Sequence, residues 1–109
     1  MGYKVIMAYI AWVHYGTSNN GCDEYLTTSS LSGELITTTY GLNPAQRFTT
    51  LEEAKDAVHK WCAKRRADLV KIGFHSGKAW NQTREGAWHY EEVEDTVVDI
   101  KELCSKYTF

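Results

Sequence analysis

His59 and Cys62 are the pair of residues whose types and spacing come nearest to a metal site. They stand three positions apart, so on a helix both side chains would lie on one face. Zinc usually takes three or four protein ligands, and closed zinc sites often use paired cysteines, which this sequence lacks. A buried thiol at Cys62, with His59 at the edge of an apolar stripe, explains both residues. We therefore expect no metal and no cofactor.

Catalytic motifs are absent from the sequence. It contains no G-x-S-x-G, P-loop, G-x-G-x-x-G or H-E-x-x-H pattern, and nothing locates a Cys–His nucleophilic pair. The neighbouring carboxylates Glu91 and Glu92 lie in an expected strand, where they would point to opposite faces and could not share a proton. We therefore predict a protein without enzymatic activity. A small enzyme whose site is assembled from distant residues is an alternative.

The charges of the chain are separated along the sequence although they nearly cancel. Lys and Arg number 12 against 14 Asp and Glu, for a net charge of −2, which argues against a general nucleic-acid binder. Segment 60–66 holds no acid among its basic residues, which are Lys60, Lys64, Arg65 and Arg66. Segment 90–102 holds Lys101 and the acids Glu91, Glu92, Glu94, Asp95, Asp99 and Glu102.

Each charged segment has a structural explanation beside a functional one. Cations near a helix C-terminus complement the helix dipole, and acids on an edge strand discourage edge-to-edge pairing. The acidic segment carries more charge than edge protection needs. A negative surface could dock on the basic, nucleic-acid-binding surface of another protein, because complementary potentials steer association.

Aromatic residues stand beside the acidic segment, at Phe74, Trp80, Trp88 and Tyr90. Rings next to charge are common in interface hot spots, although Trp88 and Tyr90 would also fit an ordinary core on one strand face. Trp80, in an expected loop, should be the most exposed of these rings. We therefore predict a partner-binding set that consists of Trp80, Trp88, Tyr90, Glu91, Glu92, Glu94 and Asp95.

A nucleic-acid-binding module is the alternative to a protein-binding one. In that case the basic helix end would contact phosphates, and the loop aromatics would stack on single-stranded bases. The residues of this alternative site are Lys60, Lys64, Arg65 and Arg66, with Lys71, Lys78 and Arg84 closer to the rings.

Four strands and one long helix must position these residues. Segments 3–15, 24–28, 34–40 and 87–93 are rich in β-branched and aromatic residues, which favours strands. Segment 3–15 is apolar on both faces, as a central strand would be, with a buried helix as the alternative. The short turns after it predict an antiparallel meander. We expect segment 74–85 to be a loop. Segment 95–107 could be a strand or a helix.

The helix has local signals at both ends. Thr50 and Glu53 form a capping box, in which the Thr50 hydroxyl accepts from the Glu53 amide and the Glu53 carboxylate reaches back to Thr50. Gly73 suits the C-terminal end. Arg65 interrupts the apolar stripe and could mark a break near Arg66 or a dimer contact, so the oligomeric state is open. The stripe consists of Leu51, Ala54, Val58, Trp61, Cys62, Leu69 and Ile72.

These elements predict one α+β domain over residues 1–109. Its antiparallel sheet should combine a three-stranded N-terminal meander with a C-terminal strand, packed on one long amphipathic helix. Three cysteines without paired spacing indicate reduced thiols in a cytosolic protein. The most apolar run, segment 5–13, is about half as long as a membrane-spanning helix, so we expect no membrane partner.

One longer pattern resembles a known class of proteins. Short N-terminal strands and a Y-L-T strand at 25–27 precede F-T-T-L-E-E-A-K at 48–55, which opens the helix. This order resembles small accessory proteins of bacteriophages and mobile elements, among them the anti-CRISPR proteins. The resemblance implies a host-directed role: binding and blocking a defence protein in the cytoplasm of a bacterial host.

Overall fold

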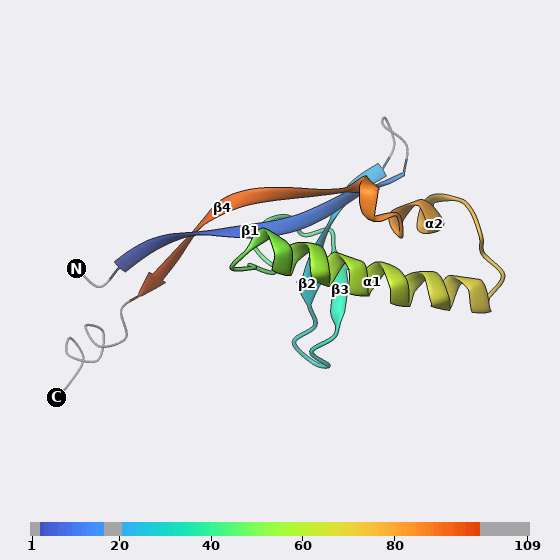
Figure 1. Cartoon of the computed structure of the whole chain (residues 1–109), viewed down its shortest axis with the longest axis horizontal. Helices are drawn as coiled ribbons and strands as arrows, with labels where there is room; N and C mark the ends of the chain where they lie inside the picture. Colours follow the sequence, from blue (N-terminus) through green and yellow to red (C-terminus); the bar gives the residue numbers. More distant parts are fainter. Residues whose placement is uncertain (1–2, 17–20, 99–109) are drawn as a thin grey trace.

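A four-stranded antiparallel sheet packs against one long helix in the computed structural model, which describes residues 3–16 and 21–98 (Figure 1). The strand order is β3-β2-β1-β4. The predicted α+β fold, with an N-terminal meander and a C-terminal strand, is therefore confirmed. The elements are β1 (Tyr3–Gly16), β2 (Gly21–Thr28), β3 (Leu35–Thr38), α1 (Leu51–Lys71), α2 (Lys78–Gln82), the 3-10 turn η1 (Glu85–Ala87) and β4 (Trp88–Val98).

Strand β1 is the inner strand that its two apolar faces predict. Its C-terminal part, from Trp12, pairs with β2, whereas its whole length up to Val13 pairs with β4. The long β1–β4 ribbon extends past the start of α1 (Figure 1). On its β2 side, Tyr9 exchanges two backbone hydrogen bonds with Phe48, at N···O distances of 2.8 and 2.9 Å. Phe48 thus pairs with β1 beyond the part of this strand that pairs with β2.

Helix α1 has the predicted cap, with one change. The Thr50 hydroxyl accepts from the Glu53 amide at 3.1 Å. The Glu53 carboxylate accepts from the amide of Thr49 at 3.1 Å, one residue earlier than predicted. Each bond satisfies a backbone donor near the helix start, where amides lack intrahelical acceptors.

The C-terminal end of α1 confirms the role of Gly73. Gly73 has a φ of 86°, and its amide and that of Phe74 donate to the carbonyls of Val70 and Leu69. This is the Schellman arrangement, which glycine adopts without steric cost. The helix runs unbroken through Arg66, so the alternative of a break is wrong. The residues that it buries are Ala54, Ala57, Val58, Cys62 and Leu69, whereas Ile72 of the predicted stripe is exposed.

A cluster of buried residues lies between α1 and one face of the sheet, whereas the buried Ala8 and Ile10 of β1 point to the other face. The cluster contains Trp88, whose indole N–H donates to the Gln82 carbonyl at 2.9 Å and whose ring meets Trp61 edge-on. Tyr90 packs against the same cluster from β4. The buried members of the cluster are Ala11, Val13, Leu26, Ala57, Val58, Cys62 and Trp88.

The segment after α1 differs from the predicted loop. Gly77, with a φ of 93°, precedes the short helix α2. Its last residue, Gln82, and the following Thr83 are buried. No side-chain cap bond marks the start of α2, so a common local signal for a helix start is missing there. At the other boundary β4 extends to Val98, which makes the first part of segment 95–107 a strand. The remainder lies outside the described residues.

Candidate functional site

The face of the sheet that points away from α1 carries three rings, one from each of three neighbouring strands. Trp12 of β1 pairs across strands with Tyr25 of β2 and with His89 of β4. The Trp12 and His89 rings are stacked, with centroids 4.3 Å apart. The Trp12 and Tyr25 centroids are 6.4 Å apart. We call Tyr25, Trp12 and His89 the ring row.

Strand alternation places the ring row on this face. Successive residues of a strand point to opposite sides, so Trp12 and His89 point away from α1 when Val13 and Trp88 point into the core. Trp12 and Tyr25 are half-buried and His89 is exposed. The row therefore presents aromatic surface to solvent and lies outside the core cluster.

Carboxylates border the ring row. The Trp12 indole N–H donates to Oε1 of the exposed Glu91 at 3.1 Å. Next to the row on β2, the Asp23 carboxylate lies 3.0 Å from Nδ1 of His14. Asp95 lies on the same face, further along β4. Aromatic faces beside carboxylates attract Lys and Arg side chains, whereas the same carboxylates repel a phosphate.

The predicted acidic set is divided between the two faces of β4. Glu91 and Asp95 point away from α1, together with the ring row. Glu92 and Glu94 point to the α1 side, and both are exposed. The four acids therefore line the strand on both faces and do not form one flat patch.

The predicted aromatic members of the set lie elsewhere. Trp88 is 5% exposed and belongs to the core, so its prediction as a partner-binding residue is corrected. Tyr90 is half-buried on the core side, and burial, then the charges of Cys62 and Glu85, raise the pKa of its phenol. Trp80 is half-buried in α2 with the Arg66 guanidinium 4.6 Å from its ring centroid, so it is not the freely exposed loop ring that we expected.

Most of the basic set is engaged within the protein. Lys60 pairs with Asp56 at 2.9 Å, and Lys64 lies 3.8 Å from a carboxylate oxygen of Glu34. Nε of Arg66 donates to Oγ1 of Thr83 at 3.1 Å. Arg65 is exposed on α1. The carboxylates of Asp56 and Glu34 reduce the positive potential beside Lys60 and Lys64, which the alternative nucleic-acid site would require.

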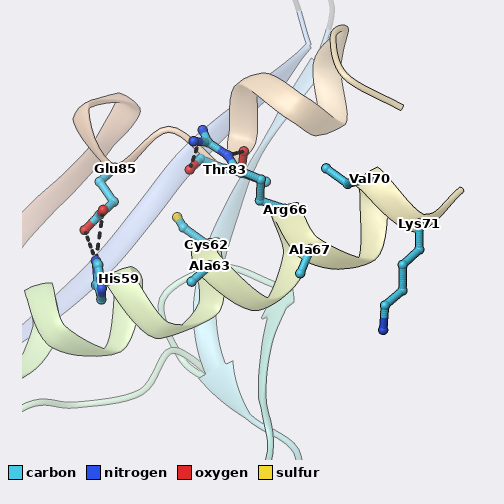
Figure 2. A pocket seen from close by; sticks show the side chains of 9 residues that line it. All are labelled: His59, Cys62, Ala63, Arg66, Ala67, Val70, Lys71, Thr83 and Glu85. Atoms are coloured by element: carbon cyan, nitrogen blue, oxygen red, sulfur yellow. Dashed lines mark hydrogen bonds and ion pairs between the residues drawn. The ribbon is translucent and has the colours of Figure 1, made fainter. Parts of the chain in front are cut away.

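A groove of about 640 Å³ lies along α1, below the chain that leads from α2 to β4 (Figure 2). At one end, Nδ1 of His59 lies 3.0 Å from a carboxylate oxygen of Glu85. Further along, Arg66 reaches across to Thr83 (Figure 2). These contacts attach the segment of residues 83–85 to α1.

Cys62 lies between these two contacts and is poorly suited to nucleophilic catalysis. Burial, and then the charge of Glu85, raises the pKa of its thiol from 9.0 to about 11. The thiol is therefore protonated at neutral pH, whereas the thiolate is both the nucleophile and the metal ligand. Within the described residues, no three His, Cys, Asp or Glu side chains are placed to hold a metal ion.

The ring row was not predicted from the sequence, although part of its signal is visible there. In segment 87–93, His89 and Glu91 alternate with Trp88 and Tyr90, which places them on the opposite face. Trp12 alternates with Val13 in the same way. The pairing of Trp12 with both Tyr25 and His89 needs the register of three strands, and this register is not encoded in any one segment.

Comparison with protein families, with curated proteins and with solved structures found no match to this chain. No helix in the described part of the chain is long and apolar enough to cross a membrane.

Proposed function

We propose that this protein is a non-enzymatic binding module that docks on a basic surface of another protein. The observation that carries the proposal is the ring row with Glu91 at its border, because rings that are partly open to solvent beside carboxylates form contacts with Lys and Arg. The proposed site differs from the one predicted from the sequence. Its aromatic residues are Trp12, Tyr25 and His89, and no longer Trp80, Trp88 and Tyr90. The acids Glu91, Glu92, Glu94 and Asp95 remain.

The resemblance to phage accessory proteins supplies the proposed setting. A bacterial defence protein that binds nucleic acid must expose a basic surface, and an acidic module that covers this surface would inhibit it. We therefore propose an anti-CRISPR-like inhibitor that acts in the host cytoplasm. Phosphate contacts are unfavourable at the ring row, because Glu91 and Asp23 border it.

The proposal is tested by affinity capture from nuclease-treated bacterial lysate with two charge-reversal variants. Glu91→Lys reverses the charge beside the ring row, and Asp68→Lys makes the same charge change on an exposed position of α1. The proposal expects Glu91→Lys to lose a basic partner that wild type and Asp68→Lys both retain. Equal capture by all three proteins would overturn it.

Nucleic-acid binding is tested separately by fluorescence anisotropy of labelled single- and double-stranded DNA and RNA at increasing salt. Arg65→Glu is the variant that changes surface charge without breaking a contact to Thr83. Replacement of Arg66 would break such a contact and so disturb the fold. Tight binding that weakens with salt and is lost in Arg65→Glu would favour the alternative function over the proposed one.

A further inference from the structure

Strand β4 has an edge that the described residues leave unpaired. It lies at the end of the sheet order, and its pairing within residues 3–16 and 21–98 is with β1. Every residue from Trp88 to Val98 has one partner in β1, so the strand contains no bulge. It also contains no proline and no lysine. Bulges, prolines and lysines are features by which proteins prevent strand addition at an edge. In β4 the acidic side chains are the remaining protection.

The Tyr9–Phe48 contact shows which backbone groups of β4 point to this edge. The N–H and C=O of Tyr9 both bond Phe48, so they point away from β4. Tyr9 is paired with Glu92, and this pair must therefore be of the non-hydrogen-bonded type. The N–H and C=O of Glu92 then point away from β1, to the free edge. By alternation, the same holds for Tyr90 and Glu94, whereas Glu91 and Val93 bond β1.

The side chains along this edge are acidic on both faces of the sheet. Residues 91–95 have the order acid, acid, Val, acid, acid. An added strand would therefore meet Glu92 and Glu94 on the α1 side and Glu91 and Asp95 on the ring-row side. A second copy of β4 would place carboxylates opposite carboxylates, which is destabilising. A strand with Lys or Arg in successive positions is complementary instead.

We propose that β4 accepts a basic β-strand of the partner at its free edge, through the backbone groups of Tyr90, Glu92 and Glu94. This inference rests on the proposed function and specifies its mode of binding. Main-chain hydrogen bonds would supply affinity, and the alternating side chains would select a basic sequence. The added strand would lie beside His89, so its side chains on that face would reach the ring row.

The probe is a capped nine-residue peptide with a Lys-Lys-Val-Lys-Lys centre and Val-Thr flanks. Two further versions carry N-methyl groups on alternate amides, one on the odd positions and one on the even positions. An added strand directs only one set of amides to its neighbour. We therefore expect one N-methylated peptide to bind about tenfold or more weakly, while the other binds like the parent. Equal binding of the two versions would overturn strand addition.

A pair of protein variants tests the same bonds from the other side. Glu92→Pro removes the charge and a backbone N–H that points to the free edge, a position at which an edge strand tolerates proline. Glu92→Gln removes the charge alone. We expect Glu92→Pro to weaken peptide binding well beyond Glu92→Gln. Equal effects would overturn the proposal. If circular dichroism shows that Glu92→Pro is unfolded, hydrogen exchange of the wild-type backbone amides serves as the test instead. Bound peptide should then slow the exchange of the Glu92 and Glu94 amides. Unchanged exchange would overturn the proposal.

Failure of this inference can be separated from failure of the proposed function. If the N-methylated peptides bind alike but Glu91→Lys still loses the captured partner, docking by charge stands and strand addition is wrong. If wild-type protein binds none of the peptides, strand addition of a basic segment is also wrong. If Glu91→Lys retains the captured partner, the proposed function itself fails.

Discussion

The indole ring of Trp12 stacks on the imidazole ring of His89 across β1 and β4, with 4.3 Å between their centroids. The same indole donates its N–H to Glu91 at 3.1 Å. Residues from opposite ends of the chain therefore form one surface, which has both aromatic and acidic character.

Replacement of Trp12 should impair binding more than stability. Trp12→Leu keeps an apolar side chain on a half-buried strand position outside the core cluster, so we expect a stability loss of about 1 kcal/mol or less. Capture of the basic partner should fall strongly, because the stacked ring and the donor to Glu91 are both lost. Urea unfolding and affinity capture measure the two effects. If Trp12→Leu captured the partner as fully as wild type, the ring row would not be part of the binding site.

Trp88 should show the opposite behaviour. It is 5% exposed and its indole N–H bonds the Gln82 carbonyl, so Trp88→Ala leaves a large cavity and removes one donor to that carbonyl, which also accepts from Sγ of Cys62. We expect a loss of about 3–5 kcal/mol in the free energy of unfolding. Urea denaturation measures it, with Trp12→Ala as the matched comparison. Similar losses for the two variants would contradict the assignment of Trp88 to the core.

The thiols of Cys22 and Cys62 should differ widely in reactivity. Cys22 is exposed and Cys62 is buried, with a pKa raised to about 11. At pH 8 a rise from 9.0 to about 11 lowers the thiolate fraction roughly 100-fold, and burial slows the reaction further. The Cys62 rate should then climb with pH until the pH reaches the pKa. Alkylation by iodoacetamide, followed by peptide mass spectrometry, measures each cysteine. Fast alkylation of Cys62 in folded protein at pH 8 would contradict the structure.

The end of α1 should depend on Gly73. Its φ of 86° lies in the left-handed region, so Gly73→Ala should cost about 1–2 kcal/mol although the added methyl group meets no atom within 4 Å. Gly86 has equally open surroundings and no positive φ. Gly86→Ala is therefore the control, with an expected change within about 0.5 kcal/mol. Urea unfolding compares the two, and equal values would show that the left-handed conformation is not retained.

The sequence alone determined the parts of this protein whose causes are local. The cap at Thr50, the glycine after the helix and the spacing of apolar residues act within a few positions of each other. They predicted α1 almost to its observed bounds. Segment 3–15 likewise showed a central strand by its two apolar faces. The short helix α2, without a local cap bond, was missed.

Only the tertiary structure decided which residues form the candidate site. Backbone pairing between distant segments sets the register, and a shift of one residue would exchange the two faces of a strand. That register brings Trp12, Tyr25 and His89 together and buries Trp88 under α1. It also divides Glu91 from Glu92 and turns the amide of Glu92 to the free edge of β4. Each of these outcomes depends on contacts between segments that are far apart in the sequence.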